Sequence, residues 1–291
     1  MSRRHLLMLA ALAAIWGSSF MFITIALRDL APSTLILLRM GSGALALAVY
    51  VRLAGHFFGA LRAYARPLAL LALINTAVPF FLIAWGQQYI DSGLAAIFNA
   101  SAPLFTALFA LSLDRSQRVT GARLAGVALA FGGVVLLVGF EVSGGERAVA
   151  GALAVVGAAA CYGIGGLYAG RRFAGLPASL VALGSLAWAT LFVLPLGAAQ
   201  ARMLGWEAFL SVLYLGVAAT GVAYVLYFGL IAGAGASKAV LVTYLVPALA
   251  LVYGAVFLDE TVTAVSLGGL ALVLAGVALG TGFVDRATVR R

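Results

Sequence analysis

Ten long apolar runs, joined by short connectors, restrict what this 291-residue chain can fold into. Only 9% of its residues are Asp, Glu, Lys or Arg, whereas soluble proteins carry about 25%. So few charges cannot cover the surface of a water-soluble domain of this size. The sequence therefore excludes a soluble enzyme, a nucleic-acid-binding protein and a disordered chain, and it indicates an integral membrane protein.

The runs have the length of membrane-spanning helices, about 20 residues each. They are continuous rather than alternating, and much longer than the ~11 residues of a barrel strand. Helices also satisfy every backbone hydrogen bond internally, as lipid requires. We therefore expect an all-α protein with ten transmembrane helices, at residues 5–27, 33–52, 67–88, 92–113, 120–139, 149–170, 177–198, 208–231, 238–258 and 263–283.

The basic residues orient these spans. Fourteen Lys and Arg residues lie at one set of span ends and three at the other, while Arg39 falls inside the second span. Cytoplasmic loops carry such an excess. The first run starts near His5 without a clear cleavage site after it, so it is expected to be a retained span. We predict a multi-pass protein of a bacterial inner (plasma) membrane, with both termini in the cytoplasm.

Two stretches of the chain resemble each other, which indicates an internal repeat. Residues 120–139 and 263–282 are identical at nine of twenty aligned positions. Upstream, Pro103 aligns with Pro247, and residues 76–78 align with 220–222. Two five-helix repeats follow, at residues 1–145 and 146–291, and because five is odd the second copy is inverted. Inverted repeats are typical of secondary transporters with a central substrate site, although duplication also produces symmetric scaffolds that do not transport.

Several motifs, each weak alone, together resemble one family over essentially the whole chain. They are residues 14–20 (AIWGSSF), Arg39 after Pro32, residues 103–108 (PLFTAL) and residues 257–260 (FLDE) before a Gly-rich run. The set resembles the EamA-type ten-helix branch of the drug/metabolite transporter (DMT) superfamily and, within it, the YddG-type bacterial amino-acid exporters. That resemblance implies amino-acid export. Residues 113–115 (LDR) depart from the second repeat's 258–260 (LDE), so this acid is not expected to be a symmetric transport element.

Three prolines inside predicted spans each free the carbonyl four residues earlier. These carbonyls belong to Asn75, Asn99 and Thr243, whose side chains are polar as well. A substrate with an amine and a carboxylate could use such groups; alternatively, they repair kinks or bridge helices. We expect a cavity bordered by the first, third, fourth, sixth, eighth and ninth spans. Its predicted wall, with interior aromatic residues, comprises Trp16, Asn75, Thr76, Pro79, Asn99, Pro103, Tyr162, Tyr224, Thr243 and Tyr244.

Arg39 is the one charged residue placed well inside a predicted span. It could bind a substrate carboxylate, cap carbonyls of neighbouring helices or snorkel to the outer interface, and the sequence favours a structural role. Gln87 and Gln88, near the outer end of the third span, are expected to face a vestibule rather than the site.

The sequence lacks the residues that several other functions would require. A single Cys excludes an intrachain disulfide, and no phosphate loop or converging catalytic set is present. We predict no catalytic residues, no metal site and no cofactor. All nine acids lie at or near span ends, and both His lie at cytoplasmic ends. Because proton-coupled carriers commonly bury such groups, we predict a facilitator that moves substrate down its own gradient.

Together these observations favour a secondary transporter that exports small metabolites, above all amino acids with aromatic or other apolar side chains, by alternating access between the two repeats. Two alternatives remain open: a drug or other metabolite exporter of the same superfamily, and a membrane-embedded lipid-modifying enzyme. We expect a transporter rather than an enzyme. Its partners would be a small-molecule substrate and the lipid bilayer, without nucleic acid, and the protein would be a monomer.

Overall fold

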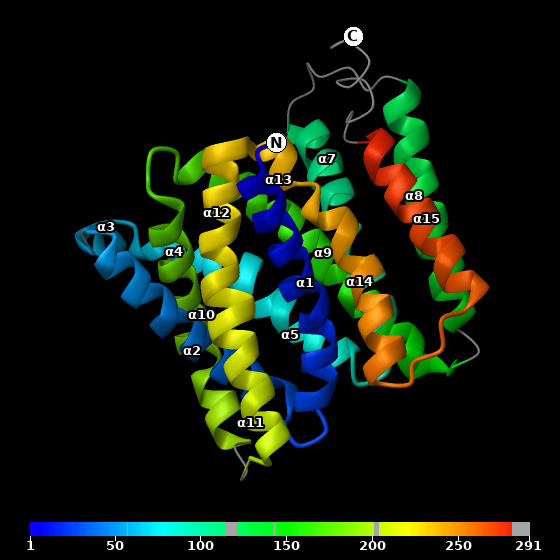
Figure 1. The fold of residues 1–291 in the computed structure, drawn as a ribbon, viewed down its shortest axis with the longest axis horizontal. Coiled ribbons are helices and arrows are strands. Elements are labelled where there is room, and N and C mark those ends of the chain that lie inside the picture. Colours follow the sequence, from blue (N-terminus) through cyan, green and yellow to red (C-terminus); the bar gives the residue numbers. More distant parts are fainter. Residues whose placement is uncertain (57, 114–120, 142–143, 201–203, 281–291) are drawn as a thin grey trace.

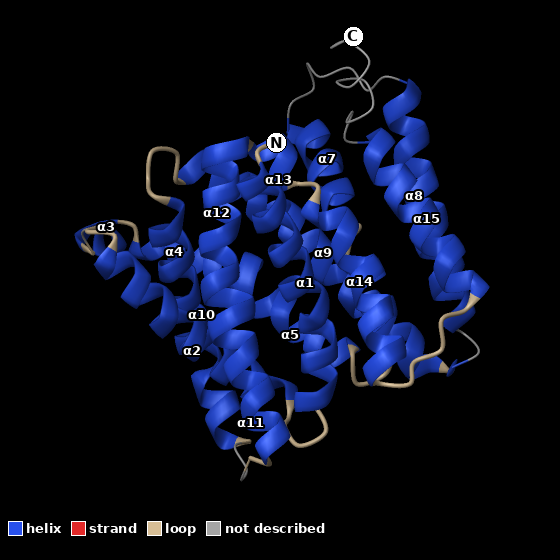
Figure 2. Ribbon diagram, viewed as in Figure 1, coloured by secondary structure: helices blue, strands red, loops and turns tan. Residues whose placement is uncertain are grey.

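The computed structural model describes residues 1–56, 58–113, 121–141, 144–200 and 204–280. Within these residues every regular element is a helix, as Figure 2 shows, so the predicted all-α class is confirmed. Some residues used above for orientation and motifs lie outside the described residues. They are Asp114, Arg115, Arg118, Arg202, Asp285, Arg286, Arg290 and Arg291.

The helices pack into one bundle, which Figure 1 colours along the chain from blue at the N-terminus to red at the C-terminus. The first elements are α1 (Arg3–Ala26), α2 (Pro32–Leu53), α3 (Gly59–Ala63), α4 (Ala65–Ala72), the π-helical segment η1 (Leu73–Ala77), α5 (Val78–Gly86), α6 (Ser92–Asn99), α7 (Ala102–Leu113) and α8 (Gly121–Glu141). The others are α9 (Glu146–Arg172), α10 (Ala178–Ala199), α11 (Trp206–Leu213), the π-helical segment η3 (Tyr214–Val222), α12 (Ala223–Ala234), α13 (Ala236–Ala239), α14 (Val242–Phe257) and α15 (Ala264–Gly280).

In the described part of the chain, seven helical stretches are long and apolar enough to cross a membrane. Three shorter apolar helices, at Leu124–Phe140, Val242–Phe257 and Ala264–Gly280, lie on the remaining predicted spans. The third, fourth and eighth predicted spans are interrupted rather than uniform helices. Each contains either a π-helical segment or a break, and these interruptions lie where the chain meets the interior of the bundle.

Helices α8 and α15 pack closely and run in opposite chain directions at one edge of the bundle (Figure 1). Four contacts lie in sequence along the pair. From one contact to the next, the residue number in α8 rises while the residue number in α15 falls. These contacts join Gly126 to Gly280, Ala130 to Gly276, Gly133 to Val273 and Leu137 to Gly269. A Cβ on Gly126, Gly133, Gly269 or Gly276 would overlap the partner helix. Close van der Waals contact between small residues is what holds helices together in lipid.

In the remaining packing, helices from the first part of the sequence contact helices from the second part. Helix α1 packs against α14, and α9 packs against α5 and α7. Helix α2 lies between α10 and η3. Elements far apart in the sequence therefore face one another around the middle of the bundle, which is where the cavity described next is found.

Candidate functional site

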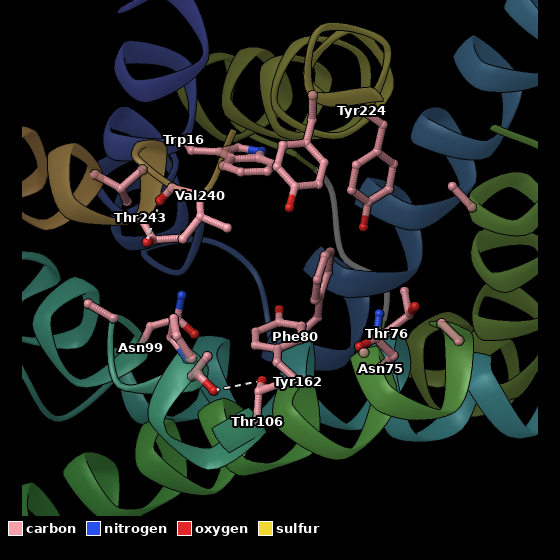
Figure 3. A pocket seen from close by; sticks show the side chains of 18 of the residues that line it. Trp16, Asn75, Thr76, Phe80, Asn99, Thr106, Tyr162, Tyr224, Val240 and Thr243 are labelled. Carbon is pink, nitrogen blue, oxygen red and sulfur yellow. Dashed lines mark hydrogen bonds between the residues drawn. The ribbon is translucent and has the colours of Figure 1, made fainter. Parts of the chain in front are cut away.

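A cavity of about 1180 Å³ occupies the centre of the bundle. It is bordered by α1, the α4–η1–α5 stretch, α6, α7, α9, η3, α12 and α14, with further contributions from α2 and α10. Figure 3 shows side chains from opposite walls pointing toward an open centre, with Trp16 and Tyr224 across from Asn99, Tyr162 and Phe80. The six spans predicted to border a central cavity all contribute to it.

Most of the predicted wall residues line this cavity. Asn75 and Thr76 come from η1, and Tyr224 comes from α12. The full set of predicted residues in the wall is Trp16, Asn75, Thr76, Asn99, Pro103, Tyr162, Tyr224 and Thr243. The other two, Pro79 and Tyr244, are described by the structure but are not among the lining residues, and Pro79 is buried.

Two of the three prolines accompany an irregular stretch of helix, where the missing N–H of proline favours one. Pro79 follows η1, and Pro103 follows the break between α6 and α7. Pro247 lies inside α14, one turn after that helix begins. The polar residue four positions earlier lines the cavity in every case. At Pro79 and Pro103 an interrupted helix thus coincides with a polar side chain that faces the interior, whereas at Pro247 the helix continues.

The three polar residues differ in their hydrogen bonds. The Oδ1 atom of Asn99 is buried without a hydrogen-bond partner among the described residues. The hydroxyl of Thr243 donates to the carbonyl of Val240 at 2.7 Å. Asn75 lies directly over Gly165 of α9, where a Cβ would overlap its side chain. Gly165 is therefore the residue that makes room for the Asn75 amide in the wall.

Aromatic side chains form much of the remaining wall. The Trp16 indole donates from Nε1 to the carbonyl of Ala219 at 3.2 Å, and its ring lies 5.3 Å from that of Tyr227. On the other side, Tyr162 meets Phe80 edge-on at 6.4 Å between ring centroids. Such a wall suits apolar or aromatic groups, because it buries area while its edges keep polar atoms available.

Arg39 is the residue whose place in the wall the sequence did not assign. It is buried, lines the cavity and donates from Nε to the hydroxyl of Thr220 at 3.3 Å. Its guanidinium lies over the Phe80 ring, 4.5 Å from the ring centroid. The alignment of residues 76–78 with 220–222 was the signal available, because it pairs Thr220 with the predicted wall residue Thr76.

Hydrogen bonds join neighbouring helices at the ends that face outward in the predicted orientation. Gln87 is buried and donates from Nε2 to the carbonyl of Phe20 at 2.8 Å and to the hydroxyl of Thr24 at 3.0 Å. Gln87 does not face a vestibule, so the expectation was wrong for this residue: its amide nitrogen donates to polar groups of α1. Gln88 is exposed, and the expectation for it stays a prediction. Glu260 accepts hydrogen bonds from the backbone N–H groups of Ser92 and Gly93, at 2.8 Å and 3.1 Å. It therefore caps the N-terminus of α6.

Among the residues that the structure describes, no group of three or more His, Cys, Asp or Glu side chains is placed to hold a metal ion. Six acids have described side chains: Asp29, Asp91, Glu146, Glu207, Asp259 and Glu260. None of these six lines the cavity. The described wall therefore offers hydroxyls, amides, aromatic rings and one guanidinium.

Known proteins resemble the chain along its whole length. A "Probable terminal-alkyne amino-acid exporter" of Streptantibioticus cattleyicolor is 31% identical, covering 95% of this chain and 91% of the relative. A "Probable amino-acid metabolite efflux pump" of Salmonella typhimurium is 27% identical, covering 100% of this chain and 99% of the relative. One solved crystal structure shares the fold, with a TM-score of 0.68 at 21% identity over 99% of each chain.

The model of the EamA-like transporter family matches residues 3–139 and 149–281. These two segments cover most of the chain and include α1 to α7 and α10 to α15 in full. Both relatives described above are named as transporters. The chain belongs to the EamA-like transporter family, within the drug/metabolite transporter superfamily.

Proposed function

We propose that this transporter exports amino acids, above all those with aromatic or other apolar side chains, by alternating access through the central cavity. One observation carries the proposal: both ends of the chain contribute to a cavity whose wall combines aromatic rings with amide, hydroxyl and guanidinium groups. An apolar side chain fits the rings, and the backbone end of an amino acid fits the polar groups. The names of two relatives, an amino-acid exporter and an amino-acid metabolite efflux pump, support the substrate class.

The transport cycle requires two halves that can exchange conformations, and we propose that they are residues 1–145 and 146–291 in inverted orientation. The antiparallel contacts between α8 and α15 support this, because the aligned repeats make these two helices equivalent. Equivalent helices that run in opposite directions are related by an axis across the bundle, as in inverted-repeat transporters.

A second pair of contacts agrees with the proposed equivalence of the two halves. A Cβ on Gly17 of α1 would lie 2.9 Å from the Cβ of Leu249 in α14. A Cβ on Gly163 of α9 would lie 2.8 Å from the Cβ of Phe105 in α7. Phe105 and Leu249 hold aligned positions, two residues after Pro103 and Pro247. In each proposed half, the residue two positions after the proline thus contacts a glycine of the other half.

We further propose that the protein lies in a bacterial inner membrane with both termini in the cytoplasm, and that this structure is its cytoplasm-facing state. The cavity wall extends to Phe173, Leu176 and Val240, which lie toward the helix ends that carry the basic excess. At the opposite ends, the Gln87 and Glu260 hydrogen bonds join neighbouring helices. Release of substrate outside requires these contacts to separate.

The size of the cavity favours a second candidate within the same class. A cavity of about 1180 Å³ exceeds the volume of a single amino acid and lies above the usual range for small-molecule sites, roughly 300–1,000 Å³. A larger apolar metabolite or drug would fill it more completely. Competition between such compounds and amino acids for transport separates the two candidates.

The experiment is flux through purified protein in liposomes loaded with labelled L-phenylalanine or L-leucine. We expect saturable efflux well above that of protein-free liposomes. Efflux equal to that of protein-free liposomes for every amino acid tried, combined with turnover of a labelled lipid, would overturn the proposal in favour of a membrane-embedded enzyme.

A further inference from the structure

A single guanidinium lies buried in the cavity wall. Arg39 of α2 is only 8% exposed. Burial of a cation is unfavourable unless a partner compensates the lost hydration. Among the side chains that the structure describes, the one ion pair joins Arg28 to Glu207, both of them well exposed. Arg39 therefore has no carboxylate partner within the described residues.

Two contacts fix the orientation of this guanidinium. Its Nε–H donates to Thr220, and the hydroxyl of Thr220 in turn donates to the carbonyl of Leu215 at 2.8 Å. The Thr220 oxygen is thus committed as an acceptor toward Arg39. The Phe80 ring covers one face of the guanidinium.

These contacts use one of the five N–H donors of Arg39. The described residues supply no hydrogen bond to its two terminal nitrogens, which carry the other four donors. A planar pair of nitrogens with parallel N–H groups matches the two oxygens of a carboxylate. The side chain is oriented before any ligand arrives, so binding requires little further ordering.

Other roles for Arg39 agree less well with this arrangement. A guanidinium that caps neighbouring helices would donate to backbone carbonyls, whereas within the described residues this one donates to a hydroxyl. A snorkelling side chain would extend to the interface, whereas this one packs on Phe80 in the wall of the central cavity.

We propose that Arg39 is the subsite that binds the carboxylate of the substrate, held in position by Thr220 and Phe80. This inference rests on the proposed transport function and defines its substrates as molecules with a free carboxylate. The ligand replaces the missing counter-ion of Arg39, while its apolar part meets the aromatic wall. A cation of the same size lacks this interaction and is repelled.

The test measures binding to purified protein in detergent, followed by tryptophan fluorescence, because Trp16 lines the cavity. The probes are L-phenylalanine, 3-phenylpropionate and phenethylamine, which carry both charged groups, the carboxylate alone and the amine alone. In the wild type, we expect both carboxylates to bind at least about tenfold more tightly than phenethylamine. Arg39→Gln should weaken both by about tenfold to hundredfold and leave phenethylamine unchanged or tighter.

Two further variants keep this test decisive. Arg39→Lys retains the charge without the planar pair of donors, so it should bind 3-phenylpropionate about tenfold more weakly than the wild type even if Arg39→Gln does not fold. Arg28→Gln removes an exposed arginine that does not line the cavity, and it should give wild-type values. Failure of both carboxylates to bind the wild type, or unchanged affinity in the Arg39 variants, would overturn the inference.

The same variants separate this inference from the proposed function. Amino-acid flux that is equal in the wild type and in Arg39→Gln contradicts the carboxylate subsite alone. Binding of 3-phenylpropionate that depends on Arg39, without amino-acid flux in the wild type, contradicts amino-acid export and leaves the subsite in place.

Discussion

The π-helical segments η1 and η3 hold aligned positions in the chain, yet their polar contacts differ. Thr76 of η1 shares a hydrogen bond of 2.7 Å with Ser185 of α10. Thr220 of η3 accepts its bond from Arg39 of α2. Both segments lie beside the cavity, and π-helical turns are frequent at functional sites. Of the two aligned threonines, Thr220 bonds to a charged side chain and Thr76 to a neutral one within the described residues.

This difference shows where the chemistry of the cavity comes from. Thr76 and Thr220 hold aligned positions in the sequence, and the neutral hydroxyl pair of Thr76 and Ser185 needs no ligand to be satisfied. A guanidinium in the same surroundings does need one. On the proposal made above, this difference between the two aligned positions would orient a substrate in the cavity.

The sharpest test of this comparison removes each threonine hydroxyl separately. Thr220→Val takes away the acceptor that orients Arg39, so the affinity for 3-phenylpropionate should fall by about tenfold. Thr76→Val removes a neutral hydrogen bond only, and its effect should stay within about twofold. Binding isotherms of the two purified variants give the ratio, and equal losses would show that the two sides are functionally alike.

A second pair of aligned residues, Asn99 and Thr243, extends the comparison to the proline-interrupted helices. Asn99 has a buried oxygen without a described partner, whereas the Thr243 hydroxyl is bonded to Val240. Asn99→Ala should therefore lower the rate of transport about fivefold, and Thr243→Val should lower it less than about twofold.

Asn75→Ala should also reduce transport, since Asn75 lines the cavity beside Thr76. The measurement is initial flux per inserted molecule, with insertion checked separately by membrane yield. Normal flux in both asparagine variants would contradict the argument from the prolines.

Gly43 of α2 packs against η3, whereas Gly184 of α10 packs against α3 and α4. A Cβ on Gly43 would lie 2.9 Å from Cγ2 of Thr220 and 3.1 Å from the carbonyl oxygen of Gly216, both in η3. A Cβ on Gly184 would meet the ends of the Leu68 and Leu61 side chains, which can move.

Gly43→Ala should therefore destabilise the protein by about 1–3 kcal/mol, and Gly184→Ala by less. Thermal unfolding in detergent gives the ranking. A Gly184→Ala variant with the lower melting temperature would mean that the backbone of η3 yields more easily than the leucines.

The sequence predicted the fold well because span positions depend on apolar length alone. It could not predict η1 and η3, because a π-helical turn leaves the hydropathy of a segment unchanged. Asn75 and Asn99 were found because proline acts on a residue four positions away in the same helix. The Arg39–Thr220 contact joins residues 181 positions apart, so no local pattern contains it. Gln87 was misjudged for the same reason, since its partners belong to α1.

The smallest expected effect on stability concerns the acids at the outer helix ends. Glu260 caps α6. Its aligned residue, Arg115, lies outside the described residues. Burial, and then the neighbouring Glu260 carboxylate, raise the pKa of Asp91 above its ordinary value. The folded protein therefore binds this proton more tightly than the unfolded chain, and its stability should rise as the pH falls through the raised pKa. Asp91→Asn should remove that dependence, as measured by melting temperature against pH.

The same acid should not couple transport to protons. Asp91 and Glu260 do not line the cavity, so protonation of either changes no group that faces the substrate in this state. An imposed pH gradient across proteoliposomes should therefore alter the rate of amino-acid flux by less than about twofold, without uphill accumulation. Asp91→Asn and Glu260→Gln should behave alike in this respect. Accumulation driven by the gradient, and lost in either variant, would show that an end-cap carboxylate enters the transport cycle and that the protein is not a facilitator.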